Sequence, residues 1–453
     1  MTPPARLRDA YKFFLPLIFM AEMMTISHSV IHAALARMEG PQAALASFSV
    51  GFATHNILGS LAWALPFVTL AFLRDKATLR SLVRFNAAVM LFLVVEYCLV
   101  GLTPVGDFVY GTLLGASPEV VWQAKWVTFI LLFQMPGVLL RSLVQAAFML
   151  HNRTILITVG TGMRVGSLFV TLPFFARFMR GGLVGAMGQA ISVHAEAYVT
   201  AALAWRYFRN LPEREGEGEP PGAGAFIRFG WPLLINMLAE HLVVFAINFF
   251  LGRLPSPDRA LAAFGVLNGL VRLLLSPVRN LAHTAQTLGR TREARRMLLR
   301  FAAQIVLFFS ALLYLLFYTR LSAWVLGDVM GLNVDLSAYI QPGLLVTLAT
   351  GLAWGYSALF RGLLSAERNT APIANASALR LVAVTAFGGA MLLLEGVNGA
   401  VFGVLALTLA FGTDVVVMGL HLSARQPAPA DVPPTAAPEP GTRPAERAPA
   451  GRA

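Results

Sequence analysis

The strongest candidate for a functional site in this sequence is an apolar segment, roughly Ala260 to Leu288, that contains a series of polar residues. Its polar side chains recur at spacings of three, four and seven residues: Asn268, Arg272, Ser276, Arg279, His283 and Gln286. At about 100° per residue they share an arc of roughly 80° on a helix, which makes one face polar and cationic. A charged side chain in mid-bilayer costs roughly 2.5 to 3.5 kcal/mol, so two arginines on one face need water, a partner or a ligand. The pattern predicts a cavity wall; alternatively, both arginines lie near a membrane boundary and snorkel or pair with acids.

Two further apolar segments carry polar faces of the same kind. Arg141 and Gln145 share one face of a helix, and Trp354 and Arg361 share a face of another. Guanidinium groups present planar donors that fit carboxylate and phosphate oxygens, so these faces favour an anionic small-molecule substrate. The predicted substrate-binding set is Arg272, Arg279, Asn268, His283, Arg141, Gln145, Arg361 and Trp354.

Titratable residues in two other segments are candidates for binding a coupling ion. Glu22, His28 and His32 share one side of a helix near the start of the chain, and Glu240 and His241 lie in a later segment. The alternative for the first group is hydrogen bonding between helices. The alternative for Glu240 is a salt bridge to a cavity arginine such as Arg272. Two histidines without a third ligand are weak support for a metal site, and we expect none.

Motifs for catalysis and nucleotide binding are missing from the sequence. It holds no GxxxxGK[ST] loop, no glycine-flanked serine with partners and no zinc-type histidine motif. The single cysteine, Cys98, excludes an intramolecular disulfide. We therefore expect no enzyme activity and no cofactor, with H⁺ or Na⁺ as the coupling ion.

The composition indicates a membrane protein built from helices. Of the 453 residues 57% are hydrophobic and only 13% are charged, and apolar runs recur from Tyr11 to Leu422. The net charge of +12 comes from basic residues in short loops, which is typical of the positive-inside rule and not of nucleic-acid binding. We expect membrane lipid as the surrounding partner and a monomer. The first apolar run, Tyr11 to Leu35, is too long for a cleavable signal peptide and should be retained.

Twelve transmembrane spans are predicted: 11–35, 44–73, 82–103, 122–149, 155–178, 183–208, 226–250, 260–287, 298–319, 338–365, 372–394 and 399–422. Arginines follow spans two and eight, whereas acids follow spans three and nine. This charge distribution predicts a multi-pass protein of the inner (plasma) membrane with both termini in the cytoplasm.

The two halves of the chain repeat each other at an offset of 216 residues. Pro16 matches Pro232, and Phe48 matches Phe264. Because six spans are an even number, both copies enter the membrane from the same side, and the repeats should be related by an axis along the membrane normal. We predict an N-lobe at 1–210, a flexible cytoplasmic linker at 211–225, a C-lobe at 226–425 and a disordered cytoplasmic tail at 426–453.

These features resemble the superfamily of multidrug and toxin extrusion (MATE) transporters and oligosaccharide or polysaccharide flippases. The similarity lies in the openings at Pro16 and Pro232, the long middle loop and LEGVNGAVFGVLA from Leu394. The progressive ankylosis family is the most similar branch, through LASF at 45–48, LLINMLAEHLVVFAINFF in span seven and NASALRLVAVTA from Asn375. The resemblance implies an all-α fold of two six-helix bundles, alternating access, and export driven by a proton or sodium gradient.

The sequence therefore predicts a secondary-active exporter of a small organic anion or amphiphile. Three alternatives remain open at this point. They are a flippase for a lipid-linked precursor, a multidrug cation antiporter and a membrane-embedded lipid enzyme.

Overall fold

A computed structural model describes residues 6–35, 37–113, 116–214, 219–329 and 334–424, and all regular structure in them is helical. The first half contains α1 (Leu7–Leu35), α2 (Pro41–Leu58), α3 (Ser60–Phe72), α4 (Lys76–Leu102), α5 (Pro104–Asp107), η1 (Phe108–Leu113), α6 (Pro118–Leu132), α7 (Met135–Leu150), α8 (Ile155–Phe175) and α9 (Gly182–Arg209). The second half contains α10 (Ala223–Leu251), α11 (Pro257–Leu275), η2 (Ser276–Asn280), α12 (Leu281–Leu288), α13 (Arg292–Phe317), α14 (Leu321–Trp324), η3 (Val325–Val329), α15 (Val334–Ala366), α16 (Ala371–Met391) and α17 (Gly399–Ala424).

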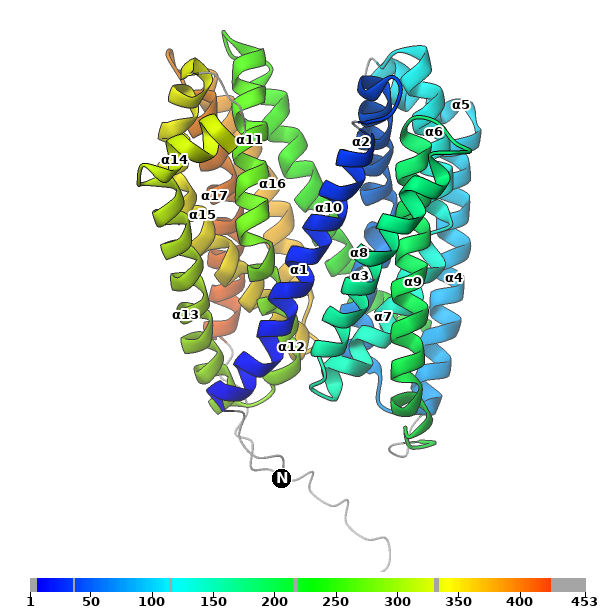
Figure 1. The fold of residues 1–453 in the computed structure, drawn as a ribbon. Coiled ribbons are helices and arrows are strands. Elements are labelled where there is room, and N and C mark those ends of the chain that lie inside the picture. Colours follow the sequence, from blue (N-terminus) through cyan, green and yellow to red (C-terminus); the bar gives the residue numbers. More distant parts are fainter. Residues whose placement is uncertain (1–5, 36, 114–115, 215–218, 330–333, 425–453) are drawn as a thin grey trace, which may run out of the picture.

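These helices form two bundles that lie side by side (Figure 1). Eight single helices are long and apolar enough to cross a membrane, and two bent pairs, α2 with α3 and α6 with α7, bring that number to ten. The segment α9 and the broken segment α11–η2–α12 complete the twelve spans. The all-α membrane fold with two six-helix bundles is confirmed.

Prolines explain where two of the spans break. The helices α6 and α7 meet at an angle of 41°, and Pro136 lies just after their junction. Because proline has no N–H, position 136 cannot donate a hydrogen bond to the carbonyl of Leu132, four residues earlier. Leu132 is the last residue of α6. Pro277 lies in the tight 3-10 turn η2, directly after α11. In span eight the sequence predicts one straight helix over 260–287, and the structure instead has a helix, a 3-10 turn and a second helix.

The internal repeat is visible in the helix bounds and in individual hydrogen bonds. An offset of 216 carries α1 onto α10 and α8 onto α16 residue for residue. Thr154 Oγ1 donates to the carbonyl of Phe13 over 2.8 Å, and Thr370 Oγ1 donates to the carbonyl of Phe229 over 2.9 Å. These residue pairs are 216 apart, so the same tertiary contact occurs in both lobes.

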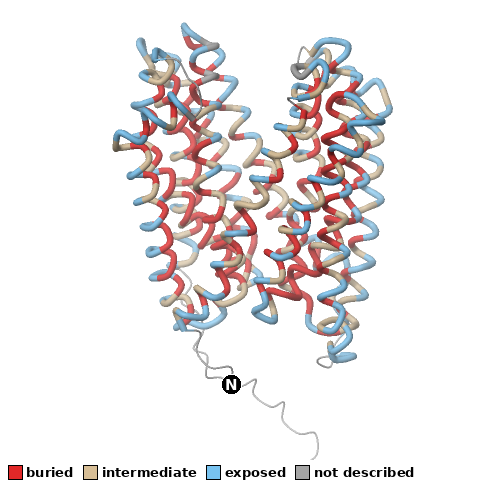
Figure 2. Tube along the Cα trace, viewed as in Figure 1, coloured by how far each residue is buried: buried red, intermediate tan, exposed pale blue. Residues whose placement is uncertain are grey.

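The lobes meet at the end of the molecule where the N-terminus lies, and they diverge toward the other end (Figure 1). One hydrophobic core runs through both lobes there, with Phe14 and Phe72 of the N-lobe packed against Phe226, Phe229 and Phe301 of the C-lobe. Figure 2 shows buried segments along the inside of each bundle and across this shared end. The contacts close the molecule at the end where the N-terminus lies.

The segment between the lobes is shorter than predicted and partly anchored. The helix α10 begins at Ala223, inside the linker expected over 211–225. Glu213 forms ion pairs with Lys76 (2.7 Å) and Arg80 (3.2 Å), which tie the start of this segment to α4. Residues 215–218 and the tail at 426–453 lie outside the described residues.

Candidate binding cavity between the lobes

A cavity of about 510 Å³ lies between the two lobes. Its N-lobe wall comes from α1, α2, α3, α7, α8 and α9, and its C-lobe wall comes from α10, α11, η2, α12 and α15. This volume is in the range that holds small organic molecules. The broken span eight runs along the C-lobe wall and brings four of the six predicted polar side chains to the cavity, those of Arg272, Ser276, Arg279 and His283.

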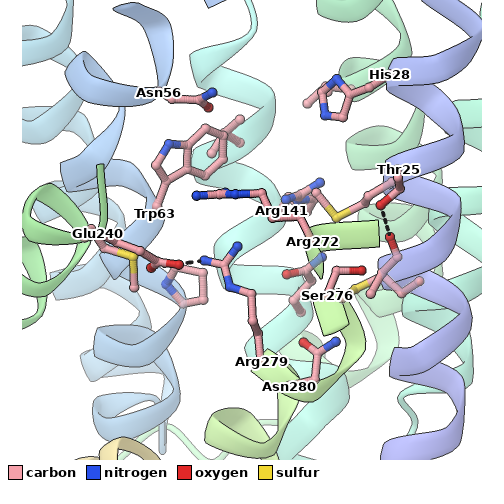
Figure 3. Close-up of a pocket in the computed structure, with 18 of the residues that line it drawn as sticks. Thr25, His28, Asn56, Trp63, Arg141, Glu240, Arg272, Ser276, Arg279 and Asn280 are labelled. Carbon is pink, nitrogen blue, oxygen red and sulfur yellow. Dashed lines mark hydrogen bonds and ion pairs between the residues drawn. The ribbon is translucent and has the colours of Figure 1, made fainter. Parts of the chain in front are cut away.

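The cavity wall is rich in arginine. Five arginines line it, namely Arg141, Arg164, Arg272, Arg279 and Arg361, whereas Glu240 is the one acid among the described lining residues. Figure 3 shows the side chains of Arg141, Arg272 and Arg279 pointing into the same space. An environment of this kind attracts anions and repels cations.

The carboxylate of Glu240 faces the guanidinium of Arg279 across the C-lobe wall. The distance from Arg279 Nη2 to Glu240 Oε2 is 3.5 Å (Figure 3), and the side chains are 42% and 11% exposed. This is the salt bridge that the sequence offered as the alternative for Glu240, made with Arg279 and not with Arg272. The pair borders the cavity, so Arg279 remains within reach of a ligand.

Arg272 differs from Arg279 because no carboxylate lies within ion-pair distance of it in the described part of the chain. Its Nε donates to Asn268 Oδ1 over 3.2 Å, one helical turn earlier. The remaining guanidinium donors face the cavity. Arg272 is therefore a half-buried cation at the cavity surface, where the carboxylate or phosphate of a ligand could accept hydrogen bonds from its guanidinium.

A single buried acid behind the wall lies beside both N-lobe arginines. Glu196 on α9 lies 3.1 Å from Arg141 and 4.0 Å from Arg164, and its side chain is 1% exposed. The sequence predicted Arg141 as a cavity arginine, and in the structure it lines the cavity and also forms an ion pair. The N-lobe wall therefore carries much less net positive charge than the number of its arginines indicates.

The fifth lining arginine, Arg361 on α15, belongs to a second buried network of hydrogen bonds and ion pairs. Arg361 donates from Nη1 to Asn236 Oδ1 over 2.6 Å. Behind it Arg380 pairs with Asp414 at 2.8 Å, and Ser357 donates to the same carboxylate over 2.9 Å. Arg164 and Arg380 are 216 residues apart, and each pairs with an acid of its own lobe, Glu196 and Asp414 respectively.

Comparison with solved structures identifies the architecture. No protein-family model and no curated protein sequence matches the chain. An outward-facing multidrug resistance MATE transporter of the MOP superfamily superposes with a TM-score of 0.73 at 15% identity, over 92% of this chain and 96% of that one. The Vibrio cholerae MATE transporter VcmN in its bent form gives a TM-score of 0.71 at 16% identity, over 92% and 97%.

The chain has the MATE fold. A MOP superfamily transporter from Pyrococcus furiosus shares it as well, with a TM-score of 0.66 at 16% identity over 93% of this chain and 97% of that one. In that transporter a reverse polarity of the binding pocket suggests a different function. The resemblance found in the sequence is confirmed at the level of this fold. The progressive ankylosis branch stays a prediction.

Within the MATE fold, most of the predicted site residues come together at the cavity. Those that line it are Arg272, Arg279, His283, Arg141, Gln145, Arg361, Trp354, His28, Glu240 and His241. Asn268, Glu22 and His32 are not among the lining residues. Asn268 instead holds Arg272, and His32 packs edge-on against Phe48 with ring centroids 5.6 Å apart.

Several lining residues escaped the sequence analysis. His55 is fully buried. Its Nδ1 shares a hydrogen bond with Tyr97 Oη over 2.7 Å, and its Nε2 lies 3.2 Å from Gln134 Nε2. Asn56 and Trp63 also line the cavity. A usable signal existed for these last two, because the repeat offset of 216 relates them to Arg272 and Arg279.

Proposed function

We propose that this protein is a secondary transporter that moves a small organic anion or amphiphile out of the cytoplasm by alternating access of its two lobes. The observation that carries the proposal is the inter-lobe cavity, lined by five arginines and one glutamate. A membrane protein buries that many guanidiniums in its interior at considerable cost, which a transported anion would offset on binding.

The charge of the cavity argues against lipophilic cations as substrates. A cation beside one of these guanidiniums would meet repulsion on the order of 1 kcal/mol or more, even at an effective dielectric near 20. A carboxylate or phosphate can instead accept two parallel hydrogen bonds from one guanidinium. The reverse polarity reported for the Pyrococcus furiosus protein supports the idea that this fold accommodates cavities of different charge.

The shape of the molecule supports a rocking mechanism. The lobes touch through α1, α3, α10 and α12 at one end, while the cavity lies between their diverging parts. Opening that contact and closing the opposite end would expose the cavity to the other side of the membrane. In this proposal the protein acts as a monomer in the plasma membrane with both termini cytoplasmic, and H⁺ or Na⁺ binding at Glu22 or Glu240 drives the cycle.

Transport into inverted vesicles tests the proposal. Purified protein would be reconstituted, and uptake of radiolabelled tricarballylate, 2-naphthoate and tetraphenylphosphonium measured under imposed proton and sodium gradients. We expect uptake of at least one anion and none of the cation. Uptake of tetraphenylphosphonium alone would identify a cation antiporter, and translocation of a polyprenyl diphosphate alone would identify a flippase. Either result would overturn the proposal.

A further inference from the structure

The two walls of the cavity differ at positions that the internal repeat makes equivalent. The offset of 216 relates Trp63 to Arg279, Asn56 to Arg272, and Met24 to Glu240, and all six residues line the cavity. In each pair the C-lobe position is ionised and the N-lobe position is neutral. Met24 and Glu240 lie on the equivalent helices α1 and α10, and Asn56 and Arg272 lie on α2 and α11, so these two pairs differ in the side chains alone. Trp63 and Arg279 differ in the backbone as well, because Trp63 lies in the α-helix α3 and Arg279 in the 3-10 turn η2.

The remaining lining residues follow the same division. In the N-lobe the apolar side chains Met20, Phe52, Pro66 and Phe67 add to Trp63 and Met24. The C-lobe wall holds far fewer apolar side chains, chiefly Met237, Leu273 and Trp354. Trp354 is 4% exposed and stacks on Phe411 with ring centroids 4.9 Å apart, so it offers little surface to a ligand.

Trp63, in contrast, keeps surface free toward the cavity. The side chain is half-buried, and its ring meets His55 only edge-on, at 6.0 Å between centroids. Phe52 is also half-buried, but its ring stacks on His55 at 5.4 Å and on Phe48 at 5.6 Å and lies beside His28 at 4.8 Å, so Trp63 offers the larger free face. Aromatic faces of this kind bind flat apolar groups through burial and stacking.

The ion pairs leave the C-lobe wall as the more cationic of the two. On the N-lobe side one carboxylate, that of Glu196, lies beside two arginines, Arg141 and Arg164, and on the C-lobe side Glu240 opposes Arg279. Arg272 is left with Asn268 as its protein partner in the described residues. A ligand with one anionic group at Arg272 keeps its apolar body free to cover the aromatic wall, whereas a compact trianion would leave that wall uncovered.

We infer that the substrate is an amphiphilic monoanion, which places its carboxylate or phosphate on Arg272 and Arg279 and lays an aromatic or similarly flat apolar body against Trp63, Phe52 and Met24. This inference rests on the proposed transport of an anion and specifies the class and orientation of that anion. The cavity volume of about 510 Å³ accommodates such a molecule in one piece.

Binding to the intact protein in lipid nanodiscs tests the inference, with calorimetry against empty nanodiscs to remove partitioning into lipid. The probes are acetate, benzoate and 2-naphthoate, which share one carboxylate and grow in apolar area, and tricarballylate, a compact trianion. We expect affinity to rise at least tenfold from acetate to 2-naphthoate, because the ring buries apolar area against Trp63. Tricarballylate should bind more weakly than 2-naphthoate.

Substitutions of Trp63 test whether the gain in affinity with apolar area comes from the N-lobe wall. Trp63→Ala should weaken 2-naphthoate about tenfold and leave acetate unchanged, and Trp63→Phe should retain most of the affinity. Trp63→Arg gives the position the side chain of its repeat partner, so we expect tricarballylate to bind tighter and 2-naphthoate weaker. The control is Trp122→Ala, at a tryptophan that is 58% exposed on α6 and not among the lining residues. It should change no affinity.

The outcomes separate the two proposals. If tricarballylate binds tighter than every monocarboxylate, or if Trp63→Ala weakens acetate and 2-naphthoate equally, the amphiphile inference is wrong while anion binding stands. Unchanged 2-naphthoate binding by both Trp63→Ala and Trp63→Arg would also overturn it. If no anion binds and tetraphenylphosphonium does, the proposed function itself fails. Should Trp63→Ala not fold, Trp63→Phe and Trp63→Arg decide the matter alone.

Discussion

His283 stacks on Phe67 with ring centroids 4.4 Å apart and an interplanar angle of 25°. The repeat offset of 216 makes these two residues the same position of the two lobes, so they meet where the pseudo-twofold axis passes between α3 and α12. Both line the cavity. Their contact forms part of the seal between the cavity and the end of the molecule at which the lobes touch.

Side-chain hydrogen bonds to backbone carbonyls hold this seal. Gln286 Nε2 donates to the carbonyl of Phe67 over 2.9 Å, and Asn280 Nδ2 donates to that of Leu17 over 3.0 Å. Removing both by Gln286→Leu and Asn280→Leu should cost the closed arrangement about 2 kcal/mol, roughly a thirtyfold change in population. We expect the lobes to separate at this end.

Spin labels at two repeat-related, exposed positions measure that separation. In a Cys98→Ser background, labels at Arg84→Cys and Arg300→Cys should show a longer distance component in the double leucine variant than in the parent. Thr287→Val is the control, because Thr287 Oγ1 donates within its own helix to the carbonyl of His283. Identical distance distributions in parent and double variant would contradict a sealing role.

Arg272 and Arg279 should be required for anion transport. Arg272→Ala or Arg279→Ala removes a forked donor from the C-lobe wall, and we expect uptake of 2-naphthoate into inverted vesicles to be abolished. Lysine at either place should restore uptake only in part, since it supplies charge without the planar pair of donors. The prediction fails if both alanine variants transport at the parent rate.

Glu22 and Glu240 are the acids predicted to couple transport to a gradient. We expect at least one of Glu22→Gln and Glu240→Gln to abolish gradient-driven uptake while leaving exchange of labelled for unlabelled anion measurable. For Glu240 the physical reason is its position opposite Arg279 at the cavity surface. If both single variants and the double variant keep the parent rate, with the same dependence on pH and sodium, neither acid carries the coupling.

The buried pair Arg380–Asp414 should matter for stability. Asp414→Asn leaves Arg380, which is 2% exposed, without its carboxylate. We expect a loss of about 3 to 5 kcal/mol in the free energy of unfolding, measured by denaturant titration in detergent. Glu213→Gln, which breaks the exposed pair with Lys76, is the matched control and should have little effect. Equal losses in the two variants would contradict the prediction.

The sequence by itself determined the architecture of this protein. Apolar runs of membrane-spanning length have few structural solutions, since backbone groups in a bilayer need internal partners, and the regular offset between Pro16 and Pro232 predicted the two lobes. The polar face of span eight also predicted a cavity wall, because burying Arg272 and Arg279 against lipid is too costly. These inferences depend only on periodicity and on the free energy of transfer, both of which are local properties of the chain.

The tertiary structure alone decided which charges face a ligand. Spacing alone does not distinguish Arg141 from Arg272, yet Glu196, 55 residues later, lies 3.1 Å from Arg141, whereas the described residues place no carboxylate within ion-pair distance of Arg272. The repeat offset relates Trp63 to Arg279 in the sequence, but only the structure places both side chains at one cavity. Pairing between distant segments is fixed by how the helices pack, and helical periodicity carries no information about it.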